Sequence, residues 1–142
     1  MPLAKTVRDL EVYQMGLSAA KSVFLLTRRF PADERFSLTD QIRRSSRAVT
    51  AMLAEAWGRR RYKASFVNKL DDAMGEANEV QAWLDHAREC GYITQEELSE
   101  LDARYQHIGG KLSRMMDRAD DFCKFVPSTD YRNITKDSRA EQ

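Results

Sequence analysis

The sequence predicts an all-α protein, an antiparallel four-helix bundle whose helices run up, down, up and down. Apolar residues recur at alternating steps of three and four in four long segments. Only six glycines and three prolines occur in 142 residues, which is too few turn signals for a many-stranded fold. The length fits one domain, with the bundle expected over residues 1–125 and a flexible tail over 126–142.

The first helix is expected over about residues 9–29. Asp9 is a plausible N-cap, and Pro31 disfavours helical geometry in the residue before it. One apolar row follows the helical period and is expected to face the core. It consists of Leu10, Tyr13, Leu17, Ala20 and Phe24.

The second helix is expected over about residues 38–57, with Ser37 as its cap and Gly58 at its end. Its row is Leu38, Ile42, Ser45, Val49, Met52 and Ala56. The third helix is expected over about 64–90, from near Ser65 to a stop at Gly91. Its row is the most regular, with Phe66, Leu70, Ala73, Ala77, Val80, Leu84 and Ala87.

The fourth helix is expected over about residues 95–124. Thr94 stands three residues before Glu97, which is the spacing of a capping box. The row that follows is Leu98, Leu101, Tyr105, Ile108, Leu112, Met115, Ala119 and Phe122. Each residue of the Gly109-Gly110 pair lowers helix stability by about 1 kcal/mol relative to alanine, which predicts close backbone packing or a kink there.

Charge is distributed unevenly along the chain. Residues 1–69 carry 14 Lys/Arg and 6 Asp/Glu, a difference of +8, whereas residues 70–142 carry 9 and 16, a difference of −7. The basic run at 41–63 contains Arg43, Arg44, Arg47, Arg59, Arg60, Arg61 and Lys63. At the helical period the first three face away from the apolar row. This run fits a nucleic-acid site, an interface with another copy, or a solvated face.

An acidic flank on the third helix is the candidate subunit interface. It consists of Asp72, Glu76, Glu79 and the aromatic Trp83. A di-iron bundle would need Glu-x-x-His on its helices, but Trp83 and Arg104 stand three residues before the two histidines. Catalytic triads and glycine-rich phosphate loops are also absent from the sequence. We therefore expect no metal, no cofactor and no enzymatic activity.

The chain has no apolar stretch that could serve as a signal peptide or a membrane span, so a cytoplasmic location is expected. Cys90 and Cys123 lack partners at metal-binding spacing. Free thiols in core or half-buried positions are the expectation for both in a reducing compartment.

The sequence resembles the bacterial four-helix bundle proteins of the ribosomal RNA intervening-sequence family, over residues 10 to about 120. The resemblance rests on Phe30-Pro31, Leu38-x-x-Gln41-Ile42-Arg43-Arg44, Ala54-Glu55 with Gly58-Arg59, Phe66 to Leu70, and Gly91-Tyr92-Ile93. It implies a barrel-like homopentamer without an established enzymatic role. By motif position, it also implies that Arg43, Arg44 and Arg59 are the shared basic residues and Glu55 the shared acid.

A related branch of this family comprises the accessory proteins of diversity-generating retroelements. That likeness implies a basic surface for nucleic acid and a reverse transcriptase as partner. The chain departs from the usual S-I-P-x-N-I-A-E-G segment, since residues 48–56 read AVTAMLAEA. Thr50, Met52 and Ala56 replace its proline, asparagine and glycine, which should leave the second helix straighter.

Three hypotheses follow. In the first, a non-enzymatic homo-oligomer, a pentamer by resemblance, binds RNA or DNA weakly and non-specifically through the basic run. In the second, the chain is a structural assembly protein, and its basic first half pairs with the acidic second half of a neighbouring subunit. In the third, it is a retroelement accessory protein.

Overall fold

The computed structural model describes residues 4–124, and within them every regular element is a helix. The four long helices are α1 (Glu11–Thr27), α2 (Leu38–Gly58), α3 (Lys63–Glu89) and α4 (Gln95–Asp117). The three short ones are η1 (Val7–Asp9), η2 (Ala32–Glu34) and α5 (Ala119–Cys123). The all-helical class and the four long helices are thus confirmed. The tail expected at 126–142 lies outside the described residues.

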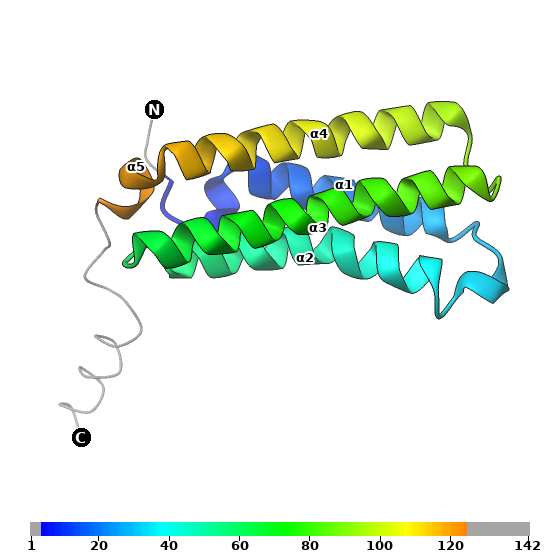
Figure 1. The fold of residues 1–142 in the computed structure, drawn as a ribbon, viewed down its shortest axis with the longest axis horizontal. Helices are drawn as coiled ribbons and strands as arrows, with labels where there is room; N and C mark the ends of the chain where they lie inside the picture. The colour runs from blue at the N-terminus through cyan, green and yellow to red at the C-terminus, as the bar shows by residue number, and fades with distance from the viewer. Residues whose placement is uncertain (1–3, 125–142) are drawn as a thin grey trace, which may run out of the picture.

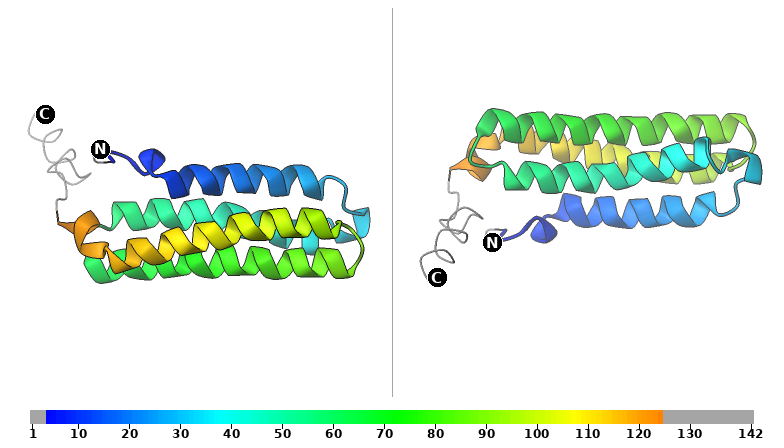
Figure 2. Two further views of the ribbon diagram at one scale, coloured as in Figure 1. Left: turned by 90° about the horizontal axis from the view of Figure 1, so that it is seen from above. Right: turned by 90° about the horizontal axis from the view of Figure 1, so that it is seen from below.

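The four long helices lie side by side and enclose one core (Figures 1 and 2). Contacts run from α1 to α2, from α2 to α3, from α3 to α4, and from α4 back to α1. At one end of the bundle lie η1, the α2–α3 connection and α5, and we call it the α5 end (Figure 1). The opposite end, which holds η2 and the α3–α4 connection, is the η2 end.

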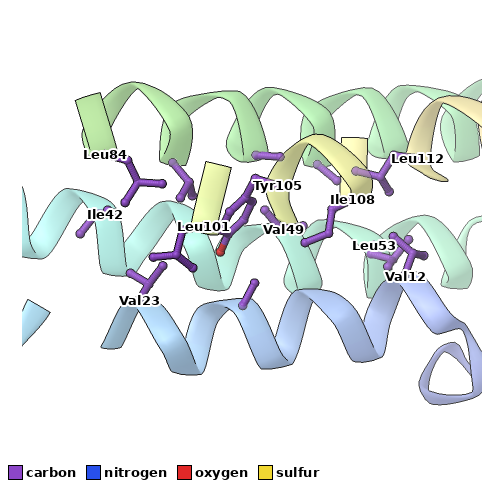
Figure 3. Close-up of a cluster of buried hydrophobic side chains, with 14 of the residues drawn as sticks. Val12, Val23, Ile42, Val49, Leu53, Leu84, Leu101, Tyr105, Ile108 and Leu112 are labelled. Atoms are coloured by element: carbon purple, nitrogen blue, oxygen red, sulfur yellow. The ribbon is translucent and has the colours of Figure 1, made fainter. Parts of the chain in front are cut away.

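The core matches the predicted rows of α3 and α4 closely. All seven residues of the α3 row are buried. On α4 and α5 the row is buried from Leu101 to Ala119, while Leu98 and Phe122 are half-buried. Figure 3 shows Leu84, Tyr105, Ile108 and other side chains of these rows interdigitating with those of α1 and α2.

The row predicted for α1 was wrong. The buried residues of this helix are Val12, Gly16, Ala19, Val23 and Thr27. Of the predicted row, Leu10, Tyr13 and Ala20 are only half-buried, and Leu17 and Phe24 are exposed. Two apolar rows therefore follow α1, and the row of smaller residues faces the core.

The two predicted caps fare differently: Ser37 occupies the N-cap position of α2, whereas Leu10, and not Asp9, is the N-cap of α1. Asp9 accepts hydrogen bonds from the backbone N–H groups of Lys5 and Thr6, both at 2.9 Å, and so caps the start of η1 instead of the start of α1. These bonds lower the pKa of the Asp9 carboxyl. At α2 the backbone N–H of Leu38 donates to Glu34 Oε2 at 3.0 Å, while the Ser37 side chain makes no capping bond.

The end of α3 and the start of α4 follow the prediction. Gly91 adopts a φ of +77°, and its N–H donates to the Arg88 carbonyl at 3.0 Å. A residue without a β-carbon is favoured in this left-handed conformation. Three residues on, the Thr94 hydroxyl accepts from Glu97 N–H at 3.1 Å and Glu97 Oε1 accepts from Thr94 N–H at 2.9 Å. The capping box is thus confirmed.

The fourth helix was predicted as one continuous element but is divided at Arg118. Arg118 adopts φ −104° and ψ 27°, which turns the chain into α5. The helix α4 continues without a break through Gly109 and Gly110. A β-carbon at Gly109 would lie 3.3 Å from the Met74 sulfur, whereas Gly110 faces open space. Close packing therefore explains only the first glycine of the pair.

Tyr105 is a polar side chain within the apolar core. It is 1% exposed, and its hydroxyl has no hydrogen-bond partner within residues 4–124. Burial raises the pKa of the phenol strongly. Its ring contributes apolar area, as Figure 3 shows, but its oxygen adds an unsatisfied polar atom to the core.

Candidate nucleic-acid interface

The basic residues of α2 do not form one surface. Arg43 and Arg47 lie on the flank that faces α1, where their guanidinium carbons are 4.8 and 5.8 Å from the centre of the Phe24 ring. Arg43 is half-buried, and its Nε donates to Thr27 Oγ1 at 2.8 Å. The expectation that all three arginines of α2 face outward was therefore wrong for Arg43, which is packed between two helices.

Arg44 lies on the side of α2 nearer to α3. Consecutive residues of a helix differ by about 100° in direction, so Arg44 points about 100° away from Arg43 and about 60° away from Arg47. Its side chain is exposed, and its charge acts on the Glu76 carboxyl of α3. The three arginines of α2 thus face two different neighbours.

The connection between α2 and α3 holds three of the predicted basic residues at the α5 end. Arg60 is half-buried, with its guanidinium 3.7 Å from the centre of the Trp57 ring and its Nε 2.8 Å from the Trp57 carbonyl oxygen. Burial lowers the pKa of Arg60. Arg59 is exposed and donates to Ser65 Oγ at 3.2 Å, and Arg61 is also exposed.

Lys63 begins α3 and is held by the short helix α5. Its Nζ lies 2.7 Å from Asp120 Oδ1, and this hydrogen bond raises the pKa of the lysine. Both side chains are mostly exposed, so the pair adds little stability. The pair links the first turn of α3 to α5.

Further basic residues reach the α5 end and were missed by the sequence prediction, and three of them lie at the end of α4. They are Lys111, Arg114 and Arg118, on the last turns of α4 and just after it. Their spacing of three and four places them on one flank of the helix, and this was the signal in the sequence. Only the folding of the bundle brings them to the end that carries the α2–α3 connection (Figure 1).

The predicted acidic flank lies along the seam between α2 and α3. Ser45 is fully buried there, donates to Glu79 Oε2 at 3.0 Å and accepts from Trp83 Nε1 at 3.3 Å. Burial raises the pKa of Glu76, as do its hydrogen bond and charge contact with Glu79. Trp83 is half-buried at the edge of the core, as predicted, and donates to Ser45 of the same chain.

Asp72 is separate from this cluster. Lys69 Nζ lies 3.6 Å from Asp72 Oδ2 and 2.9 Å from Glu55 Oε2. The hydrogen bond from Lys69 lowers the pKa of Glu55. The acid that the family resemblance singled out is thus engaged by a lysine of α3.

An exposed apolar surface runs along the outside of α1. Leu17 is 49% exposed, Phe24 38% and Leu25 50%. Tyr13 and Ala20 continue the row as half-buried residues. We call Tyr13, Leu17, Ala20 and Phe24 the outer row of α1, whereas Leu25 points about 100° away from Phe24 and lines a groove against α4. An exposed apolar row along one helix is typical of a protein contact.

Within residues 4–124, no group of three or more His, Cys, Asp and Glu residues is placed to hold a metal ion. Cys123 is half-buried, but Cys90 is exposed, contrary to the prediction for that thiol. Among the described helices, none is both long and apolar enough to cross a membrane.

These features define a helical protein with a basic end and an exposed apolar helix face. Residues 8–114 match the model of the 23S rRNA-intervening sequence protein family, and the chain belongs to that family. A search of curated proteins finds no match.

A solved structure from Bacteroides thetaiotaomicron is similar to this chain. It is described as a protein with unknown function from the S23 ribosomal protein family. The two share 27% sequence identity and a TM-score of 0.65, over 74% of this chain and 97% of the other.

Proposed function

We propose that this protein is a homo-oligomeric helical bundle that binds nucleic acid weakly, and without sequence preference, through the α5 end. The observation that carries this proposal is that basic side chains from two distant segments meet at that end. They are Arg59, Arg60, Arg61, Lys63, Lys111, Arg114 and Arg118. The expected partner is RNA or DNA, and the proposal involves no catalysis.

The charge pattern of the α5 end suits phosphate groups better than base edges. Lys63 and Lys111 are held by carboxylates, at 2.7 Å from Asp120 and 3.1 Å from Glu11. Arg114 and Arg118 form no ion pair within residues 4–124. A guanidinium group pairs with phosphate oxygens in a planar fork, and such contacts give affinity without reading sequence.

The opposite end of the bundle is less suited to a polyanion. The η2 end carries Asp33, Glu34, Glu89, Glu96, Glu97 and Glu100, which are partly balanced by Arg28, Arg29, Arg35 and Arg88. A nucleic acid would therefore be drawn to the α5 end and oriented away from the other.

The test is a titration of labelled RNA and DNA across salt concentrations. We expect affinity to fall with salt by roughly one power of concentration for each phosphate contacted. The double variant Arg59→Glu/Arg114→Glu should weaken binding at least tenfold at low salt. The matched control Arg28→Glu/Arg88→Glu makes the same change in net charge, but at the η2 end. Equal losses in both variants, or no binding at 50 mM salt or below, would reject the proposal.

A second function is favoured by the outer row of α1. This alternative is structural self-assembly, in which the outer row and the adjoining Arg43 and Arg47 dock against the acidic flank of a neighbour. Complementary charges on two different surfaces of one chain suit a head-to-tail contact, which closes into a ring. The family resemblance suggests five up-down-up-down subunits in such a ring.

The self-assembly alternative is tested by Leu17→Ser/Phe24→Ser, with Asn78→Ser on exposed α3 surface as the control. We expect the double variant to lower the oligomer mass in multi-angle light scattering while the helical circular dichroism is retained. An unchanged oligomer mass would show that the outer row of α1 is not part of an interface. If the Arg43→Ala/Arg44→Ala/Arg47→Ala variant dissociates, these arginines serve assembly and not nucleic acid.

A further inference from the structure

A groove opens at the α5 end between the start of α1 and the last turns of α4. Its volume is about 200 Å³. Leu10, Val12, Met115 and Phe122 form the apolar floor, and Glu11, Lys111, Arg114 and Arg118 form the rim. An apolar cavity of ~150 Å³ can hold a benzene molecule, so this groove has room for one aromatic ring.

The floor of the groove is continuous with an aromatic cluster. Phe122 stacks on Phe66 with ring centres 5.8 Å apart and meets Trp57 edge-on at 6.5 Å. Arg60 covers the other part of this cluster through its contact with the Trp57 ring. Phe122 therefore connects the groove to the basic α2–α3 connection.

The rim keeps a positive charge after its internal pairing. Glu11 is engaged by Lys111 at 3.1 Å, and the two arginines of the rim form no ion pair within residues 4–124. A ligand that fits such a groove combines an apolar ring with an adjacent anion. A duplex presents its phosphates outside and hides its bases in the stack, whereas a single strand offers both together.

We propose that this groove takes an unpaired base of single-stranded nucleic acid, with the neighbouring phosphate held by Arg114 and Arg118. This inference rests on the proposed nucleic-acid binding at the α5 end and adds the class of ligand. The base lies against the apolar floor, and the strand continues over the α2–α3 connection. Pairing into a duplex removes the base from reach and weakens binding.

The test compares three probes of equal length and label by fluorescence anisotropy at low salt. These are a uridine oligonucleotide, the same strand with abasic sites, and an RNA duplex. We expect the single strand to bind the full-length protein about fivefold or more tightly than the abasic strand, as base stacking on apolar side chains predicts. Arg114→Ala/Arg118→Ala should weaken binding of the single strand more than binding of the duplex.

Leu10→Trp serves as the variant that fills the groove. It should remove the preference for the intact single strand and leave duplex affinity within about twofold. Leu26→Trp is the matched control, because Leu26 is a half-buried leucine that lines the other groove of the same α1–α4 seam. That control should keep the preference.

The outcomes distinguish failure of the groove proposal from failure of the proposed nucleic-acid binding. Equal affinity for all three probes, with a steep salt dependence, would overturn the groove and leave binding at the α5 end intact. No binding to any probe would overturn both. A change of oligomer mass in Leu10→Trp, but not in Leu26→Trp, would make the groove a contact between copies and overturn its assignment to nucleic acid.

Discussion

Helices α1 and α3 use their apolar residues in different ways. Every residue of the single apolar row of α3 is buried against α2 and α4. The helix α1 carries two such rows, and only the row with Gly16 and Ala19 faces the core of the bundle. The contrast teaches that an apolar row locates a helix face that packs, but it does not say against what.

Side-chain size explains which row of α1 turns inward. A β-carbon at Gly16 would lie 2.8 Å from Thr50 Cγ2, so α1 meets α2 where its side chains are smallest. The seam between α1 and α4 is more polar. There Arg104 donates to Ser18 Oγ at 2.9 Å and to Ser22 Oγ at 2.8 Å. The larger residues Leu17 and Phe24 remain outside.

The largest expected effect on stability comes from truncating a buried side chain of the apolar row of α3. Phe66→Ala removes a fully buried ring that stacks on Phe122, and it should lower the free energy of unfolding by about 3–5 kcal/mol. Urea denaturation followed by circular dichroism measures this loss. Asn78→Ala, on the exposed side of the same helix, is the control and should change stability by less than about 0.5 kcal/mol. A loss below about 1 kcal/mol for Phe66→Ala would mean that α3 is not the centre of the core.

Two glycine-to-alanine substitutions test how closely α1 approaches α2. Their expected effects on stability are smaller and have opposite signs. Gly16→Ala should lower stability by about 1–3 kcal/mol, because the new methyl group meets Thr50. Gly110→Ala faces open space within α4 and should raise stability by about 0.5–1 kcal/mol through helix propensity. Thermal unfolding of the two variants measures both. A stabilised Gly16→Ala variant would show that α1 can shift away from α2 without loss.

The smallest effect concerns the acidic side of α3. The pKa of Glu76 is raised above its ordinary value of 4.5, because the carboxyl is partly buried beside Glu79. A carboxyl with a raised pKa stabilises the fold below pH 4.5, and this contribution is lost as the pH rises through the raised pKa. At pH 7 the free energy of unfolding of Glu76→Gln should therefore exceed that of the wild type by on the order of 1 kcal/mol, and the variant should unfold at a higher temperature.

The control for this effect is the same comparison at pH 4. There the wild-type carboxyl is protonated, and the two proteins should unfold at nearly the same temperature. Asp85→Asn, on exposed α3 surface, should show no such dependence on pH. A Glu76→Gln variant that is less stable at pH 7 would indicate that the charged carboxylate is favourable in the fold.

Where one apolar row dominates a helix, the fold was predictable. The α3 row, most of the α4 row and the Thr94–Glu97 capping box follow from spacing alone. On α1 the two rows obey the same period, so the sequence could not choose between them. The choice depends on how closely α2 can approach α1, which is a property of the packed bundle.

The candidate site was less predictable for a similar reason. The run of arginines at 43–61 was visible, but the direction of each side chain depends on which neighbour it meets. Arg43 bonds to Thr27 of α1, and Arg44 faces α3. Lys111, Arg114 and Arg118 join the α5 end only because α4 ends there, far along the chain from Arg59.

The turn of the chain at Arg118 has a practical consequence for any shortened version of this protein. The match to the family ends at residue 114, yet Phe122 of α5 rests on Phe66 and Trp57. A truncation at residue 114 would remove Phe122 and expose the apolar rings of Phe66 and Trp57 to solvent. An expression design should therefore extend at least through Lys124, so that α5 continues to cover this end of the bundle.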